Sequence, residues 1–182
     1  ARQSTLLAGG GSLELDASRG RARKLAPLQV DLCGIAKGYA VDRMVAELRR
    51  HGVRHALAAL DGELRAVGGQ ASGAPWAVAL EGPEEGHRSI HGVIELTDLA
   101  VATSGDYRRF MKVGGVRLAH TMDPRTGAPV VGSPASVTVL GQSCMMADAM
   151  ATALMVMGVE PGSNFATDHA ISALFLRRSL GG

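Results

Sequence analysis

The chain has 182 residues, of which 46% are hydrophobic and 20% are charged, and its formal net charge is +2. This length and apolar content can bury a substantial core, so we predict one domain over residues 1–182. One Trp, two Tyr and three Phe leave little material for stacking on bases, and with so little excess charge this argues against nucleic-acid binding.

Apolar periodicity and glycine-rich turns predict many short strands interrupted by helices. In chain order, the predicted elements are strands at Leu13–Asp16 and Leu28–Leu32, a helix at Ile35–His51, strands at His55–Leu60, Glu63–Val67 and Trp76–Leu80, an exposed loop at Glu81–Ser89, strands at Ile90–Leu96, Leu99–Thr103, Val116–Thr121 and Ser136–Leu140, a helix over 143–158, a short helix near Ser163–Thr167 and a last strand at Ile171–Leu176. Strands joined by tight turns pair antiparallel, so the predicted class is α+β, a largely antiparallel sheet covered by helices.

The helix over 143–158 is almost entirely apolar, with Ser143 as its predicted N-cap and Gly158 as its end. It carries one acid, Asp148, and one hydroxyl, Thr152, on the same face. We expect Asp148 to be buried, where a carboxylate needs a partner. Carboxylate and hydroxyl oxygens suit Mg²⁺, whereas the alternative is a structural acid that accepts backbone or hydroxyl hydrogen bonds.

The first long helix carries Lys37 and Gly38 in its first turn, where both are locally unfavourable. Its apolar side is predicted to hold Tyr39, Met44, Val45 and Leu48. A cation and a permissive backbone at this helix end make sense if an anion such as phosphate binds there. The alternative is a solvated Lys37 and a Gly38 that close helix packing requires.

Two further segments combine turn residues with groups that can do chemistry. His120 precedes the strong turn sequence of residues 123–127, and it either binds a ligand or moves a proton, or is a structural histidine. For Arg125 in that turn, the alternative to a functional role is likewise no more than a surface charge. Hydroxyls and a glycine end the strand before Asp106, which suits phosphate contacts or a helix N-cap equally.

Four motifs occur in this order between Leu28 and Leu176. They are Asp-Leu-Cys-Gly-Ile-Ala-Lys-Gly-Tyr-Ala-Val-Asp, Ala-Thr-Ser-Gly-Asp-Tyr-Arg-Arg-Phe, His-Thr-Met-Asp-Pro-Arg-Thr-Gly and Ala-Asp-Ala-Met-Ala-Thr-Ala-Leu. Together they resemble the ApbE family of FAD:protein FMN transferases. The resemblance implies an α+β fold that binds FAD and magnesium, and an enzyme that moves FMN from FAD onto a threonine hydroxyl of an acceptor protein and releases AMP. Some members also hydrolyse FAD to FMN and AMP.

The resemblance also implies a metal site. Its ligands would be the side chains of Asp148 and Thr152 and the main-chain carbonyl of Gly34, which joins the first long helix to the second. Magnesium held there is expected to neutralise diphosphate oxygens and to position the bond between the FMN and AMP phosphoryl groups.

The flavin nucleotide is expected to contact four residues by the same resemblance. Asp31 and Lys37 would bind FAD, with Lys37 near the diphosphate. His120 and Thr121 would line the flavin site. His120 is the expected catalytic residue, which assists proton transfer from the acceptor threonine.

Several positions depart from the family pattern. Cys33 stands where glycine is usual and is expected to crowd the turn that presents Gly34. Asp61 and Glu63 stand where the family has glycine and aspartate, and Ala59 replaces a polar residue, changes expected to weaken or redirect flavin binding. The family also has about a hundred further residues upstream, by ordinary domain sizes, that supply part of the flavin pocket.

These departures keep two alternatives open. One is a non-catalytic flavin-binding or interaction domain, and the other is a magnesium-dependent FAD pyrophosphatase without a protein acceptor. The resemblance implies a periplasmic protein or a membrane-anchored lipoprotein of bacteria, with a cytoplasmic protein as the alternative. No apolar run approaches the roughly 18 residues that a membrane-spanning helix needs, so no span is expected.

Overall fold

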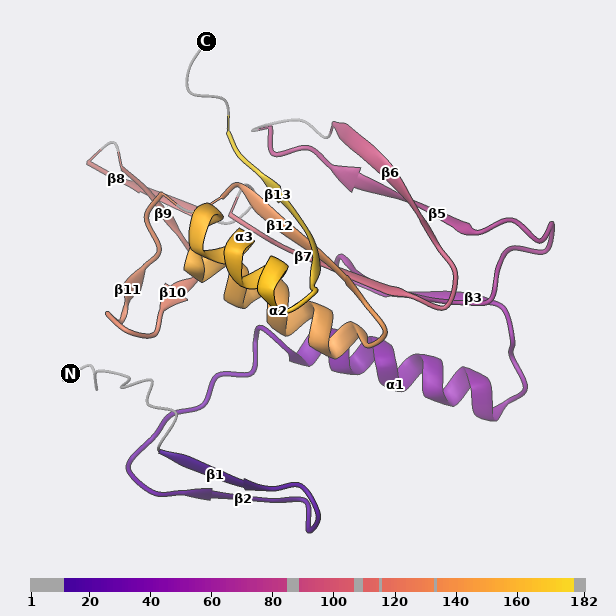
Figure 1. Cartoon of the computed structure of the whole chain (residues 1–182), viewed down its shortest axis with the longest axis horizontal. Helices are drawn as coiled ribbons and strands as arrows, with labels where there is room; N and C mark the ends of the chain where they lie inside the picture. Colours follow the sequence, from indigo (N-terminus) through magenta and orange to yellow (C-terminus); the bar gives the residue numbers. More distant parts are fainter. Residues whose placement is uncertain (1–11, 85–88, 107–109, 115, 133, 179–182) are drawn as a thin grey trace.

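A five-stranded antiparallel sheet organises the fold (Figure 1). The computed structural model describes residues 12–84, 89–106, 110–114, 116–132 and 134–178. The sheet has the strand order β13-β12-β7-β4-β3, and every neighbouring pair runs antiparallel. Its strands are β3 (Ala56–Leu60), β4 (Glu63–Val67), β7 (Ala100–Gly105), β12 (Ser136–Gly141) and β13 (Ser172–Leu176). The predicted α+β class with a largely antiparallel sheet is confirmed.

Three helices cover one face of this sheet (Figure 1). They are α1 (Ala36–Arg50), which contacts β3 and β4, α2 (Cys144–Met157), which contacts β7 and β12, and α3 (Val159–Asp168), which contacts β13. Ala151, Leu154 and Met155 of α2 pack on Val137 and Val139 of β12. Because a strand alternates its side chains between faces, the residues of β12 that meet α2 recur at every second position.

A long hairpin covers the opposite face of the sheet. It consists of β5 (Trp76–Glu81) and β6 (Ile90–Leu96), and its Val78 and Leu96 pack on Ala66 and Val101 of the sheet. In β4, Ala66 therefore points to the hairpin, while Glu63, Arg65 and Val67 point to the helices. This alternation places two charged side chains of β4 directly under α1.

Three smaller hairpins lie outside the central sheet. They are β1 (Leu13–Asp16) with β2 (Arg21–Lys24), β8 (Phe110–Val113) with β9 (Val116–Ala119), and β10 (Met122–Asp123) with β11 (Ala128–Pro129). The predicted turn after β10 is confirmed: the Asp123 carboxylate accepts the Arg125 N–H at 2.9 Å and pairs with its guanidinium at 2.8 Å. This pairing lowers the pKa of Asp123, chiefly through the Arg125 side chain.

Most predicted elements agree with the structure to within two residues at either end, but one predicted strand does not form and one predicted helix begins earlier than expected. Leu28–Leu32 forms no strand, because no described strand pairs with it and Val30 and Leu32 stay exposed. The third helix begins at Val159, before the expected Ser163, since a proline such as Pro161 is tolerated in a first turn, where its missing N–H has no partner to lose.

The apolar side of the first long helix agrees with the expectation at Val45 and differs from it elsewhere. Gly38, Val41 and Val45 are its buried residues, whereas Tyr39 and Met44 are exposed, because the close approach of α2 at Gly38 selects the buried face. The predicted exposed loop at Glu81–Ser89 is partly wrong, because Glu81 ends β5 and Gly82 is buried, and its residues 85–88 lie outside the described part of the chain. Among the described helices, none is long and apolar enough to cross a membrane.

Candidate functional site at the α1–α2 junction

The two long helices meet at Gly38 and Asp148. The Gly38 N–H donates to Asp148 Oδ2 at 3.0 Å, and the Asp148 side chain is 3% exposed. A Cβ atom at Gly38 would overlap the Cys144 carbonyl oxygen and lie 2.8 Å from Asp148 Cβ. The predicted burial of Asp148 is confirmed, and so is the explanation of Gly38 as a glycine that close helix packing requires.

Thr152 brings two more segments to the same place. A Cβ atom at Gly34, in the turn before α1, would lie 3.1 Å from Thr152 Oγ1. Thr152 Oγ1 also lies 2.9 Å from Ser104 Oγ at the end of β7. The segment that ends in Asp106, whose hydroxyls we singled out from the sequence, thus reaches α2 through Ser104.

The chemistry of these groups fits a hard divalent cation. Gly34, Asp148 and Thr152 offer a carbonyl, a carboxylate and a hydroxyl oxygen, the donor types that Mg²⁺ prefers. In the described part of the chain, no group of three or more His, Cys, Asp or Glu side chains could hold a metal. A cation at this junction would therefore depend on main-chain and hydroxyl oxygens as well as on Asp148.

Lys37 is paired with a buried acid. Its Nζ lies 2.7 Å from Glu63 Oε1, and the Glu63 side chain is 1% exposed against 37% for that of Lys37. Burial raises the pKa of Glu63, and nearby Asp148 adds to this, while the Lys37 ammonium works in the opposite direction. Lys37 is thus held by Glu63 rather than simply solvated, in the first turn of α1 as expected.

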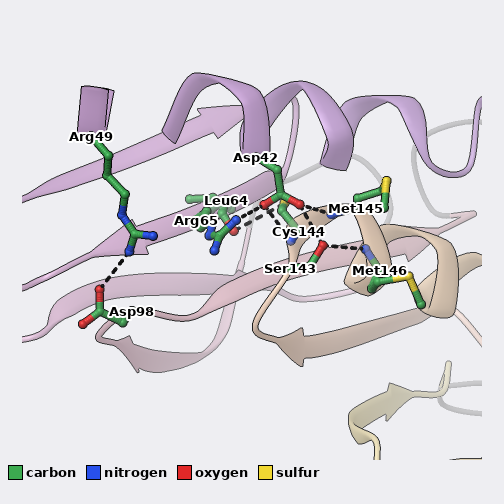
Figure 2. Close-up of polar contacts among 9 residues, drawn as sticks. All are labelled: Asp42, Arg49, Leu64, Arg65, Asp98, Ser143, Cys144, Met145 and Met146. Atoms are coloured by element: carbon green, nitrogen blue, oxygen red, sulfur yellow. Dashed lines mark hydrogen bonds and ion pairs between the residues drawn. The ribbon is translucent and has the colours of Figure 1, made fainter. Parts of the chain in front are cut away.

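A second carboxylate fastens α1 to the start of α2 (Figure 2). Asp42 accepts hydrogen bonds from the Cys144 and Met145 N–H groups, each at 3.0 Å, and from Ser143 Oγ at 2.7 Å. Arg65 of β4 pairs with it at 2.5 Å. Burial alone would raise the pKa of Asp42, but the hydrogen bonds, led by that from Met145, outweigh burial and lower it.

The N-terminus of α2 is capped as predicted. Ser143 Oγ accepts the Met146 N–H at 3.3 Å, which satisfies one of the orphan donors of the first turn (Figure 2). Cys144 is buried beside this cap, its Sγ donates to the Leu64 carbonyl oxygen at 3.6 Å, and burial raises the pKa of its thiol to about 12. Cys144 therefore stays a protonated core residue.

The turn before α1 accommodates Cys33. The Cys33 side chain is exposed, and its N–H donates to Asp31 Oδ1 at 2.7 Å. Hydrogen bonds from Cys33 lower the pKa of Asp31. Cys33 is not among the described non-glycine residues with a positive φ, so the turn that carries Gly34 forms without the backbone conformation that would require glycine.

The other predicted site residues lie on different elements. His120 and Thr121 lie between β9 and β10, His120 exposed and Thr121 half-buried with its carbonyl oxygen accepting the Val130 N–H at 3.0 Å. Asp61 is exposed in the turn between β3 and β4 and has a φ of 49°. Of the predicted metal ligands, Gly34 lies against Thr152, and Asp148 lies one turn before Thr152 on α2.

Sequence reasoning did not assign a site role to Asp42 or Glu63, and it did not predict that Ser104 contacts Thr152. The contacts of Ser104 and of Asp42 join strands and helices that are far apart in the chain. Glu63 was noted only as a departure from a family pattern, although a charged residue at an inward position of a strand is itself a signal of a buried partner.

Replacing Gly38 by alanine is expected to destabilise the protein, although alanine normally favours a helix by about 1 kcal/mol over glycine. The new methyl group must push α2 away from α1, since it overlaps Cys144 and crowds Asp148. Such overpacking typically costs about 1–3 kcal/mol. Denaturant unfolding measures the change, with Gly92→Ala as the matched control because a Cβ there meets open space. A Gly38→Ala variant as stable as that control would contradict the packing.

The chain matches the model of the ApbE family over residues 2–175. It is 43% identical over 155 residues to a FAD:protein FMN transferase of Vibrio cholerae, covering 85% of this chain and 46% of the relative. A FAD:protein FMN transferase of Haemophilus influenzae is 34% identical over 171 residues, covering 92% of this chain and 49% of the relative.

Solved structures agree with this sequence similarity. The apo flavinyl transferase ApbE of Pseudomonas stutzeri superposes with a TM-score of 0.82 at 38% identity, covering 96% of this chain and 54% of that one. The flavin transferase ApbE of Vibrio cholerae gives a TM-score of 0.80 at 41% identity, covering 93% and 53%. The chain spans about half the length of the relatives that it matches. With a family match over almost its whole length and this shared architecture, the chain belongs to the ApbE family.

Proposed function

We propose that this protein transfers FMN from FAD to a threonine hydroxyl of an acceptor protein, with Mg²⁺, and releases AMP. The observation that carries the proposal is the contact of Gly34 with Thr152, one helical turn beyond buried Asp148 on α2, in a chain of the ApbE family. Relatives of this chain bear the name FAD:protein FMN transferase.

In this proposal, the junction binds the diphosphate of FAD. The Gly34 carbonyl, the Asp148 carboxylate and the Thr152 hydroxyl would hold Mg²⁺, which supplies charge neutralisation for the diphosphate oxygens when bound. The Lys37 ammonium, beside the same junction, orients the diphosphate. Asp31, in the turn before α1, contributes a further contact to FAD.

The transfer forms one phosphorus–oxygen bond and breaks another. The acceptor threonine oxygen attacks the FMN phosphorus, the bond from that phosphorus to the AMP phosphate oxygen breaks, and AMP leaves with the electron pair. His120 takes the hydroxyl proton, and its exposure is compatible with an acceptor that is itself a protein. Thr121 lines the flavin site beside it. Most of the acceleration then comes from positioning and electrostatics.

Product analysis tests this function. We expect the purified 182-residue chain, incubated with FAD and a threonine-containing acceptor peptide, to release AMP when Mg²⁺ is present and none when EDTA replaces it. Chromatography quantifies AMP and FMN in both samples. Release of AMP with an equal amount of free FMN, even when an acceptor is supplied, would assign a pyrophosphatase instead. No AMP under either condition would favour a non-catalytic flavin-binding domain.

We further propose that the protein works in the bacterial periplasm, free or as a membrane-anchored lipoprotein. The support for this location is the family resemblance. Fractionation of cells that express the gene from its own start codon tests the location, and recovery of all the protein with cytoplasmic markers would contradict it.

A further inference from the structure

Glu63 poses a problem that the proposed chemistry does not solve. Its side chain is only 1% exposed, its Oε1 accepts from Lys37, and no described donor reaches its Oε2. Replacing a buried ion pair by apolar side chains of similar size is often neutral or stabilising. Stability alone therefore does not explain why β4 carries an acid here.

The geometry around Glu63 suggests a role through its partner. Lys37 has three N–H donors, and one of them points to Glu63 Oε1 at 2.7 Å. The Lys37 side chain is 37% exposed, so its ammonium sits at the boundary between a buried anchor and solvent. A free lysine side chain samples many rotamers, and much of this freedom is lost whenever the side chain is fixed on a ligand.

Rigid elements support this anchor. Glu63 begins β4, which pairs with β3 on one side and with β7 on the other. Two residues further along the same face, Arg65 pairs with Asp42 of α1. Strand β4 thus contacts α1 through two described ion pairs. In one pair the strand supplies the acid, Glu63, and in the other it supplies the base, Arg65. Of these two pairs, the one formed by Glu63 involves a residue of the first turn of α1.

We infer that Glu63 is a positioning residue that holds the Lys37 ammonium ready for the diphosphate of FAD. The inference rests on the proposed function, because it takes FAD as the anion. Glu63 does not touch the nucleotide itself. It removes conformations of Lys37 that would otherwise be lost on binding, and this gain exceeds the repulsion that its own carboxylate adds.

A double-mutant cycle tests this role without turnover. Equilibrium dialysis in EDTA measures the FAD affinity of the unmodified chain, Glu63→Gln, Lys37→Gln and the double variant. We expect Glu63→Gln to weaken FAD binding about tenfold when Lys37 is present, and Lys37→Gln to weaken it at least as much. In the Lys37→Gln background, Glu63→Gln should leave the affinity unchanged or slightly raise it, since only a repulsive charge is lost.

Arg65→Gln is the matched control, because it breaks the other ion pair between the same strand and helix. It should lower the melting temperature yet leave FAD affinity within about twofold. Two results would overturn the positioning role. One is that Glu63→Gln and Lys37→Gln weaken FAD binding independently, so that their fold-losses multiply in the double variant. The other is that Glu63→Gln alone leaves FAD affinity unchanged. Unmodified protein that binds FAD but releases no AMP would contradict the transferase proposal while the cycle still reports on Glu63.

Discussion

Asp148→Asn is expected to lower magnesium-dependent AMP release by at least about a thousandfold, because the proposed cation site loses its only negatively charged ligand. A cation at a phosphoryl-transfer site supplies several kcal/mol of charge stabilisation, and about 4 kcal/mol corresponds to that factor. The fold should survive, since the asparagine oxygen can still accept the Gly38 N–H that Asp148 now accepts at 3.0 Å. Initial rates of AMP formation across a Mg²⁺ titration measure the effect.

Asp148→Ala separates the two roles of this side chain. It removes the metal ligand as well as the acceptor for Gly38, so we expect the same loss of activity with about 1–3 kcal/mol of added instability. Asp168→Asn, an exposed acid at the end of α3, should change neither property. We would abandon the metal assignment if Mg²⁺ stimulated Asp148→Asn as strongly as it stimulates the unmodified chain.

Asp42→Asn should destabilise the protein by about 3 kcal/mol at neutral pH. The change weakens three hydrogen bonds at the start of α2 and leaves half-buried Arg65 without its ion-pair partner. Breaking a buried pair costs about 3–5 kcal/mol, and the partial exposure of this one places it at the lower end. Urea denaturation measures the difference, and Glu47→Gln, which removes an exposed pair with Arg50, should cost far less.

The effect of Asp42→Asn should also depend on pH. The folded-state pKa of Asp42 is lowered, so the ionised carboxylate contributes its stability fully above the usual aspartate pKa of about 3.9. That contribution is lost as the pH falls through the folded-state pKa. The stability gap between the unmodified chain and the variant should therefore be constant from pH 7 to about pH 5 and shrink at lower pH. A gap that widens on acidification would contradict this assignment.

Local sequence patterns predicted the pieces of the site well. The caps at Ser143 and Gly158 and the apolar run between them identified α2, and an acid inside such a run had to be buried. Gly38 was recognisable because glycine is unfavourable inside a helix unless something approaches closely. These inferences depend on neighbours within a few turns of the chain.

The arrangement of the pieces depends on contacts that local patterns do not encode. Glu63 meets Lys37 across 26 residues, Ser104 meets Thr152 across 48, and Asp42 meets Ser143 across 101. The first contact depends on the packing of α1 on β4 and the second on the packing of α2 on β7, and strand order in the sheet that carries β4 and β7 is a property of the whole chain. Leu28–Leu32 illustrates the same limit, because alternating apolar residues form a strand only where another strand is available to pair.

The most direct test of the account is whether flavin becomes covalently attached to a threonine. The chain is incubated with FAD, Mg²⁺ and a threonine-containing acceptor peptide, and mass spectrometry reads the peptide. We predict FMN on the threonine, none on a peptide with valine in its place, and none when EDTA is present or when Asp148→Asn replaces the unmodified chain. Metal-dependent cleavage of FAD to AMP and free FMN, with the peptide left unmodified, would contradict the transferase assignment.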